Sequence, residues 1–187
     1  DAPGTQVTVT LGDKSVSATA NAKGEWKATL PALKADGKTY ALTVKGTSTV
    51  SFGDILIGEV WLCSGQSNME MGIKACLNAD TEVAAANWPA IRLFLIPKLF
   101  LAKPTNDVNA SWRVCTPTAI AEGGWGGFSA AAYYFGRTIH TNLKIPVGLI
   151  DTAWGCTLIE PWTPPEGFAT IPALQVQLTQ ALAMNPA

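Results

Sequence analysis

The sequence feature that most constrains the fold is a change in hydrophobic pattern near residue 53. Before it, short runs alternate polar and apolar residues and are separated by turns rich in Gly, Asp and Asn; they are QVTVTL, SVSATA, EWKATL and YALTVKG. This alternation, carried largely by Thr and Val, predicts β-strands of a meander or sandwich. After residue 53 the apolar runs become continuous. We therefore divide the chain into a β-rich piece, residues 1–52, and a second region, residues 53–187.

Strand and helix signals alternate in the second region. Residues 55–63 and 91–96 are nearly continuous apolar runs, which predict strands covered on both faces. Residues 129–143 carry apolar positions three and four apart and predict a helix, and residues 146–151 predict a further strand. The stretch 123–127, GGWGG, is predicted to be a mobile loop. The alternation as a whole predicts an α/β fold with a parallel sheet.

A serine stands where the first buried strand is expected to end. Residues 65–69 read GQSNM, and the following residues, EMGIKA, can continue as a helix. A serine at such a turn presents its hydroxyl at the carboxyl end of the sheet, where backbone N–H groups can hold a developing oxyanion. Ser67 is therefore a candidate nucleophile, and a helix N-cap is the alternative. Met69 departs from the Gly-x-Ser-x-Gly elbow, which disfavours an ordinary α/β-hydrolase.

Three segments of the sequence resemble a known family. GDILIGEVWLCSGQSNMEM (53–71), FSAAAYYFGRTIH (128–140) and IPVGLIDTAWGCTLIEPW (145–162) are similar, in this order, to segments of the sialate O-acetylesterase-like carbohydrate esterases of the SGNH hydrolase superfamily. The resemblance implies an α/β fold: an incomplete flavodoxin-like SGNH hydrolase core preceded by a small β-sandwich-like piece. It implies that the protein removes acetyl groups from sialic acid or from a plant polysaccharide such as xylan. It also implies a secreted, periplasmic or lysosome-like location.

The resemblance assigns catalytic roles to two residues. It makes Ser67 the nucleophile of a serine acyl-enzyme mechanism, and it places the oxyanion in a hole formed by the N–H groups of Ser67 and Gly155. Cys156 stands where the family usually has a second glycine, so a side chain there is expected to narrow the pocket or shift the loop.

Further residues near these two are expected to contact the sugar. Gln66 and Asn68 flank the nucleophile, and Glu160 and Trp162 match positions at the rim of the site in the resemblance. For Trp162, packing in the core is the alternative to stacking on a sugar face. Asp151 ends a predicted strand, where it is expected to bind the loop backbone; orienting a base or binding substrate is the alternative.

The general base that a serine nucleophile needs is not evident in the sequence. His140 is the only histidine, and it lies in the predicted helix 129–143. It is interpreted as an ordinary helix residue, although a small esterase that uses His140 is an alternative. The family's Asp-x-x-His segment and its Gln-Gly-Glu block do not occur after Trp162. A truncated chain, an incomplete sequence, or a second chain that carries the Asp and His would each explain this.

The resemblance implies that the partner is an acetylated carbohydrate. The rival function is a non-catalytic carbohydrate-binding or accessory protein of the same fold. Thirteen basic and fourteen acidic residues, with no basic run, give no support to nucleic-acid binding. The apolar windows are too short to span a membrane. No cofactor is expected, since a serine, a base and oxyanion donors carry out acyl transfer by themselves.

The cysteines do not form a metal-binding pattern. The four residues, Cys63, Cys76, Cys115 and Cys156, show no Cys-x-x-Cys pair and no neighbouring histidine cluster, so no metal site is expected. A disulfide between Cys76 and Cys115 is one interpretation. The other is that the cysteines are small buried hydrophobic residues.

Overall fold

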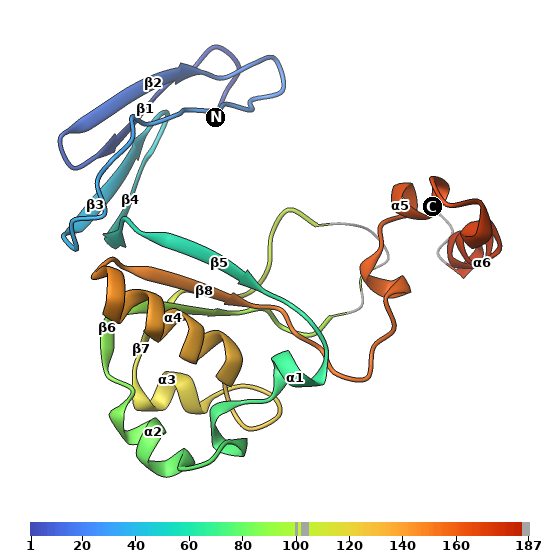
Figure 1. Cartoon of the computed structure of the whole chain (residues 1–187). Coiled ribbons are helices and arrows are strands. Elements are labelled where there is room, and N and C mark those ends of the chain that lie inside the picture. The colour runs from blue at the N-terminus through green and yellow to red at the C-terminus, as the bar shows by residue number, and fades with distance from the viewer. Residues whose placement is uncertain (100, 102–104, 185–187) are drawn as a thin grey trace.

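The computed structural model describes residues 1–99, 101 and 105–184 and contains two β-sheets joined in a mixed α/β fold, as predicted (Figure 1). The strands are β1 (Gln6–Leu11), β2 (Lys14–Thr19), β3 (Thr39–Lys45), β4 (Thr49–Leu56), β5 (Glu59–Cys63), β6 (Trp88–Leu95), β7 (Arg113–Cys115) and β8 (Val147–Asp151). The α-helices are α1 (Ser67–Glu70), α2 (Ala79–Ala85), α3 (Pro117–Ala121), α4 (Ala130–Leu143), α5 (Pro165–Ala169) and α6 (Gln175–Met184). Three short 3₁₀ helices are η1 (Ile73–Ala75), η2 (Glu160–Trp162) and η3 (Pro172–Leu174).

The N-terminal piece is an antiparallel sheet with strand order β2-β1-β3-β4. Three of the predicted runs form its strands β1, β2 and β3. The prediction of a strand at residues 25–30 is wrong, although side-chain exposure still alternates there. Alternation records which side chains face the protein, whereas a strand also needs a paired neighbour for its backbone N–H and C=O groups.

The chain passes from the first sheet to the second within the predicted strand 55–63. β4 pairs with β3 as far as Leu56, and β5 begins at Glu59 in the other sheet. The predicted single strand is therefore two strands, which belong to different sheets. The first sheet ends a few residues beyond residue 53, and the division of the chain into two domains stays a prediction.

The second sheet has the order β5-β8-β6-β7. β8 runs parallel to both of its neighbours, with Val147 opposite Glu59 of β5 and Asp151 opposite Cys63. The short strand β7 is antiparallel to β6, so the sheet is parallel only in part. Because β5, β6 and β8 point the same way, the loops that follow them meet at one edge of the sheet.

Helices α2, α3 and α4 lie on one face of this sheet, as Figure 1 shows. Side chains from that face of the strands, including Ile91, Leu93 and Leu149, are buried against α4, whose Tyr133 is fully buried. The predicted helix 129–143 and the predicted strand 146–151 are both confirmed within a residue. This helical layer supplies the core of the second region.

Strand β5 differs from the prediction that it is covered on both faces. Val60, Trp61 and Leu62 are 60%, 42% and 69% exposed. β5 is the edge strand of the sheet and pairs only with β8 within the described residues. Its apolar sequence is therefore that of a central strand, placed here at an open edge.

The helix after the candidate nucleophile is shorter than predicted. α1 ends at Glu70, and the chain then forms an isolated bridge between Gly72 and Ser129 before η1. The Gly72 N–H donates to the Trp125 carbonyl at 2.8 Å, and the Lys74 N–H donates to the Gly126 carbonyl at 2.9 Å. These bonds hold residues 72–74 against the glycine-rich loop 123–127, so they replace the hydrogen bonds that a continuing helix would need.

All four cysteines are free, so the Cys76–Cys115 disulfide is absent from the structure. Cys63 and Cys115 are buried, as the second interpretation expects, whereas Cys156 is exposed. Burial raises the pKa of the Cys115 thiol to about 12. Burial, with a contribution from Asp151, also raises the pKa of Cys63.

At pH 8 we expect iodoacetamide to modify Cys156 in the folded chain and to leave Cys115 unmodified, because the thiolate is the reactive form. Peptide mass spectrometry before and after unfolding in urea would measure this, and all four cysteines should react once unfolded. Rapid modification of Cys115 in the folded chain would contradict the burial described here. Above the unfolded thiol's pKa, the unfolded chain loses this proton while the folded chain keeps it, so Cys115 should make folding less favourable as pH rises toward 12.

Candidate active site

Ser67 lies at the carboxyl edge of the parallel strands, on the turn after β5 (Figure 1). Gln66, rather than Ser67, occupies the N-cap position of α1. The Ser67 side chain is half-buried, and its hydroxyl has no hydrogen-bond partner in the part of the chain that the structure describes. The hydroxyl therefore does not cap the helix, and it remains available for chemistry.

The loop after β8 continues alongside this turn and brings Gly155 to Ser67. The Thr152 N–H donates to the Cys63 carbonyl at 3.0 Å, and the Trp154 N–H donates to the Gly65 carbonyl at 2.9 Å. A Cβ atom placed on Gly155 would lie 3.1 Å from Ser67 Oγ. The two residues that the resemblance assigns to catalysis are thus neighbours, although they are far apart in sequence.

The Gly155 N–H, however, is not a free oxyanion donor in this structure. It donates to the Glu70 carboxylate, and the other oxygen of that carboxylate accepts from the Lys98 ammonium group. A Cβ on Gly155 would lie 2.6 Å from Glu70 Oε2, so a larger residue here would require the Glu70 carboxylate to move. The donor that the resemblance assigns to the substrate is occupied by a side chain of the protein.

Gln66 and Trp162 both contact Thr157 in the loop after β8. Gln66 Nε2 donates to the Thr157 carbonyl at 2.5 Å, and Trp162 Nε1 donates to Thr157 Oγ1 at 2.9 Å. Thr157 Oγ1 in turn donates to the Trp154 carbonyl. In this structure Gln66 and Trp162 therefore order the loop beside the nucleophile. Trp162 is still 39% exposed, so it is not fully packed in a core.

The other two predicted substrate residues are not joined to Ser67. Asn68 is exposed beside it, and Glu160 begins η2 with a half-buried side chain. Neither side chain forms a hydrogen bond with another of the described residues. Cys156 adopts φ 60°, a left-handed conformation that favours glycine, in agreement with the usual glycine of the family there.

His140 lies near the amino-terminal ends of the parallel strands, whereas Ser67 lies at their carboxyl-terminal ends. Its Nδ1 is 2.6 Å from the carbonyl oxygen of Ile145, just before β8 begins, and its ring packs edge-on against Trp88. Since β5 and β8 are parallel and in register, the start of β8 is separated from Ser67 by the length of the strands. The structure therefore places His140 as an ordinary helix residue.

Asp151 binds the backbone around it, as the sequence favours. Its carboxylate accepts from the Ser129 N–H at 3.2 Å and from the Ala153 N–H at 3.0 Å. Burial raises the pKa of Asp151, while these two N–H donors act in the opposite direction. The carboxylate thereby links the end of β8 to the start of α4.

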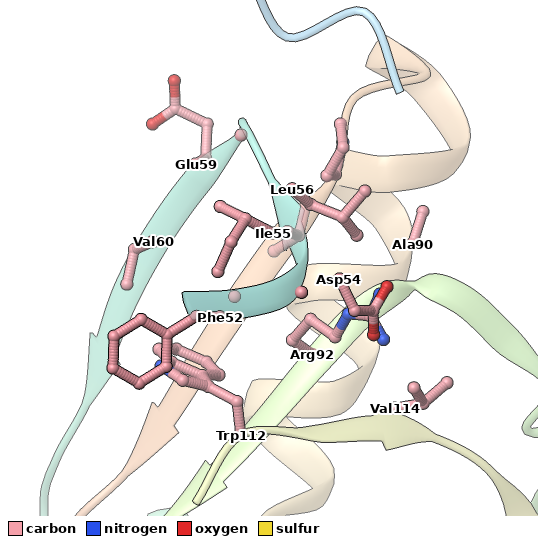
Figure 2. Close-up of a pocket in the computed structure, with 15 residues that line it drawn as sticks. Phe52, Asp54, Ile55, Leu56, Glu59, Val60, Ala90, Arg92, Trp112 and Val114 are labelled. Carbon is pink, nitrogen blue, oxygen red and sulfur yellow. The ribbon is translucent and has the colours of Figure 1, made fainter. Parts of the chain in front are cut away.

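Among the described residues, two cavities of similar size border the second sheet. One, of about 420 Å³, is lined by apolar side chains such as Phe52, Val60 and Trp112 on the sheet face away from α4 (Figure 2). It lies near the amino ends of β5 and β8, at the other end of the parallel strands from Ser67. The other, of about 430 Å³, lies at the carboxyl edge and includes Lys98, the partner of Glu70.

No cluster of three or more potential metal ligands occurs among residues 1–99, 101 and 105–184. Over the same residues, none of the helices has the length and apolar character needed to cross a bilayer.

The chain is similar to known esterases in sequence and in structure. Sialate O-acetylesterase of Mus musculus is 32% identical over 175 residues, which are 86% of this chain and 32% of that protein. The Homo sapiens protein of the same name is 31% identical over 86% of this chain and 34% of its own length. A carbohydrate acetylesterase from Xanthomonas citri matches with a TM-score of 0.82 and 29% identity, over 100% of this chain and 44% of its own.

The resemblance to sialate O-acetylesterase-like carbohydrate esterases is confirmed. No family model matches the chain. This esterase-like chain spans about a third of the length of the curated relatives that it matches.

Sequence reasoning about this esterase-like chain missed Glu70 and Lys98. Glu70 follows Ser67 by three positions, and serine followed by glutamate at this spacing is typical of a capping box. That pattern would return the carboxylate to the start of its own helix, yet Glu70 instead binds Gly155. A capping box would have given Glu70 a backbone partner in its own helix, whereas its partner Gly155 lies on a different loop.

Proposed function

We propose that this chain is the nucleophile-bearing part of a carbohydrate O-acetylesterase. The observation that carries the proposal is the placement of Ser67, with an unpaired hydroxyl, on the turn after β5 and beside Gly155. The curated relatives are named sialate O-acetylesterases and the solved neighbour a carbohydrate acetylesterase, which supports the same reaction class here.

In the proposed reaction, Ser67 Oγ attacks the carbonyl carbon of an acetyl ester while a general base removes the hydroxyl proton. The tetrahedral intermediate collapses, the bond to the sugar oxygen breaks, and that oxygen takes the proton from the base. Water, deprotonated by the same base, then attacks the acetyl-serine ester. Acetate leaves, and Ser67 recovers its proton.

The oxyanion would be bound first by the Ser67 N–H, which needs no rearrangement. The Gly155 N–H can join it only after Glu70 has released that donor, since the two acceptors would compete for one hydrogen. In this conformation of the site, the Ser67 N–H can therefore bind the oxyanion at once, whereas the Gly155 N–H is occupied by Glu70.

The base is proposed to come from outside these residues, on a second chain or segment that carries the catalytic Asp and His. The position of His140 supports this, because its ring is bonded at the other edge of the sheet. The edge of β5 offers a place for the proposed chain or segment. Val60 and Leu62 are exposed there, beside the backbone groups of an edge strand.

The substrate is proposed to be an acetylated carbohydrate, either an O-acetylated sialic acid or a plant polysaccharide such as xylan. Trp162 is partly exposed next to the Gln66–Thr157 contact, so its ring can present a face to a sugar. A secreted, periplasmic or lysosome-like location would match such a substrate and remains part of the proposal.

A non-catalytic carbohydrate-binding protein of the same fold is the second candidate. The observation that favours it is the occupied Gly155 N–H, because an esterase that never frees this donor would stabilise the oxyanion less well. The unpaired hydroxyl of Ser67 opposes it.

Acetate release from acetylated sialic acid and from acetylated xylan tests the proposal, with the chain measured alone and together with a chain that carries the Asp-x-x-His segment. We expect release only from the mixture. If the two chains bind each other yet release no acetate from either substrate, the non-catalytic alternative is correct. Release by this chain alone would show that its own residues include the base.

Replacing His140 with alanine should leave the acetate release of the mixture unchanged, since the ring is bonded to the Ile145 carbonyl far from Ser67. Loss of that hydrogen bond is expected to lower the free energy of unfolding by about 1 kcal/mol. Activity assays and urea unfolding of the same preparation would separate the two effects. A variant that folds but is inactive would make His140 the base.

A further inference from the structure

Glu70 connects the loops that follow three adjacent parallel strands. It ends α1 on the loop after β5, its carboxylate accepts from Gly155 on the loop after β8, and it pairs with Lys98 on the loop after β6. Its side chain is only 15% exposed, whereas most charged side chains lie on the surface. A charge placed this far from water needs partners, and both of its oxygens have one.

The surroundings of the Glu70–Lys98 pair limit its freedom further. A Cβ on Gly124 would lie 3.2 Å from Lys98 Nζ and 3.4 Å from Glu70 Oε1, so the glycine-rich loop passes directly over the pair. The Lys98 ammonium group also lies 5.9 Å from the centre of the Trp154 ring. The ion pair is thus enclosed by the loop that carries Gly155 and by the glycine-rich loop.

The same contact fixes the distance between the candidate nucleophile and its neighbour. Glu70 is one turn of helix after Ser67, and a Cβ on Gly155 would be close to both Glu70 Oε2 and Ser67 Oγ. A charged carboxylate that accepts a backbone N–H forms a stronger hydrogen bond than a neutral acceptor does. Holding Gly155 through Glu70 therefore also holds the loop after β8 against Ser67.

We infer that Glu70 is a positioning residue for the candidate active site: its ionised carboxylate, held by Lys98, binds the Gly155 N–H and sets the position of the loop after β8 relative to Ser67. The catalytic meaning of this role rests on the proposed function of Ser67. The contact itself does not, and it can be tested without any activity.

The first test follows the Gly155 amide of the 187-residue chain by NMR as the pH is lowered. We expect its proton to resonate downfield and to shift upfield as an acidic group is protonated, because the charge-assisted bond then weakens. Glu70→Gln should place the amide upfield at all pH values and remove the titration. The matched control is Glu59→Gln, which replaces an exposed glutamate at the start of β5 and should change neither property.

Each outcome of this test shows whether Glu70 binds the Gly155 N–H. If the wild-type Gly155 amide does not titrate, or titrates unchanged in Glu70→Gln, the inference is wrong. Should Glu70→Gln fail to fold, Lys98→Met removes the charge that stabilises the ionised carboxylate, so the Gly155 amide of that variant should titrate at a higher pH than in the wild-type chain or lose its downfield shift. A Gly155 titration identical to that of the wild-type chain would overturn the inference as well.

The second test uses the active mixture of chains and asks whether the contact positions Ser67. We expect Glu70→Gln to lower kcat by about 10- to 100-fold with little change in KM, because a small misplacement of reacting groups has effects of this size. An unchanged kcat would limit Glu70 to a structural role and reject the positioning role. If the wild-type mixture releases no acetate, the proposed function fails, while the NMR test still decides whether Glu70 holds Gly155.

Discussion

Replacing Ser67 with alanine is expected to lower acetate release by the active mixture of chains about a thousandfold or more. Alanine removes the oxygen that forms the acyl-enzyme, so no other change in the site can restore the covalent step. The fold should be unaffected, since the Ser67 hydroxyl has no partner among the described residues and does not cap α1.

Ser64→Ala provides the matched control for this experiment. Ser64 is an exposed serine on the same turn, and it should retain wild-type activity when it is replaced. Activity would be measured as acetate released over time, and folding by circular dichroism. Equal activity of Ser67→Ala and the wild-type chain would show that Ser67 is not the nucleophile, and the proposed mechanism would then be wrong.

A large loss of stability is expected for Gly72→Ala. A Cβ at this position would lie 2.3 Å from the carbonyl carbon and oxygen of Gly126 and 2.5 Å from the Gly127 nitrogen. These are backbone atoms, which cannot rotate away as a flexible side chain could. The contact and the hydrogen bonds from residues 72–74 to the glycine-rich loop should be lost together, and we expect the free energy of unfolding to fall by about 3 kcal/mol.

Gly53→Ala is the control for Gly72→Ala, because a Cβ on Gly53 would meet nothing within 4 Å. Its free energy of unfolding should stay within about 0.5 kcal/mol of the wild-type value. Urea unfolding followed by circular dichroism would compare the variants under the same conditions. If Gly72→Ala were as stable as Gly53→Ala, the tight approach of the two backbones would not exist in solution.

Much of the fold could be predicted because its signals are local. The alternation of β1, β2 and β3, the helical spacing of α4 and the apolar run of β8 are each contained in a few residues. The strand predicted at 25–30 failed for lack of a paired neighbour. The burial predicted for β5 failed because it depends on whichever elements flank that strand, and sequence periodicity does not report them.

The candidate site was predicted in part for the same reason. The GQSNM turn is a local pattern, and it located Ser67 at the carboxyl edge of the sheet. The ion pair of Glu70 with Lys98 and the contact of Glu70 with Gly155 join residues from separate loops, the latter 85 positions apart. Such contacts follow from the order of the strands, and one sequence alone does not contain that order. The Gly155 donor was therefore assigned without the carboxylate that occupies it.

The exposed edge of β5 also affects how this chain should behave when it is purified. β5 carries three consecutive exposed apolar residues, Val60, Trp61 and Leu62, and its side away from β8 pairs with no described strand. Natural sheets usually protect such edges with charged residues or proline, because an open apolar strand can template aggregation. Self-association through β5 should therefore increase with protein concentration, and Leu62→Lys should reduce it by placing a charge on the exposed strand.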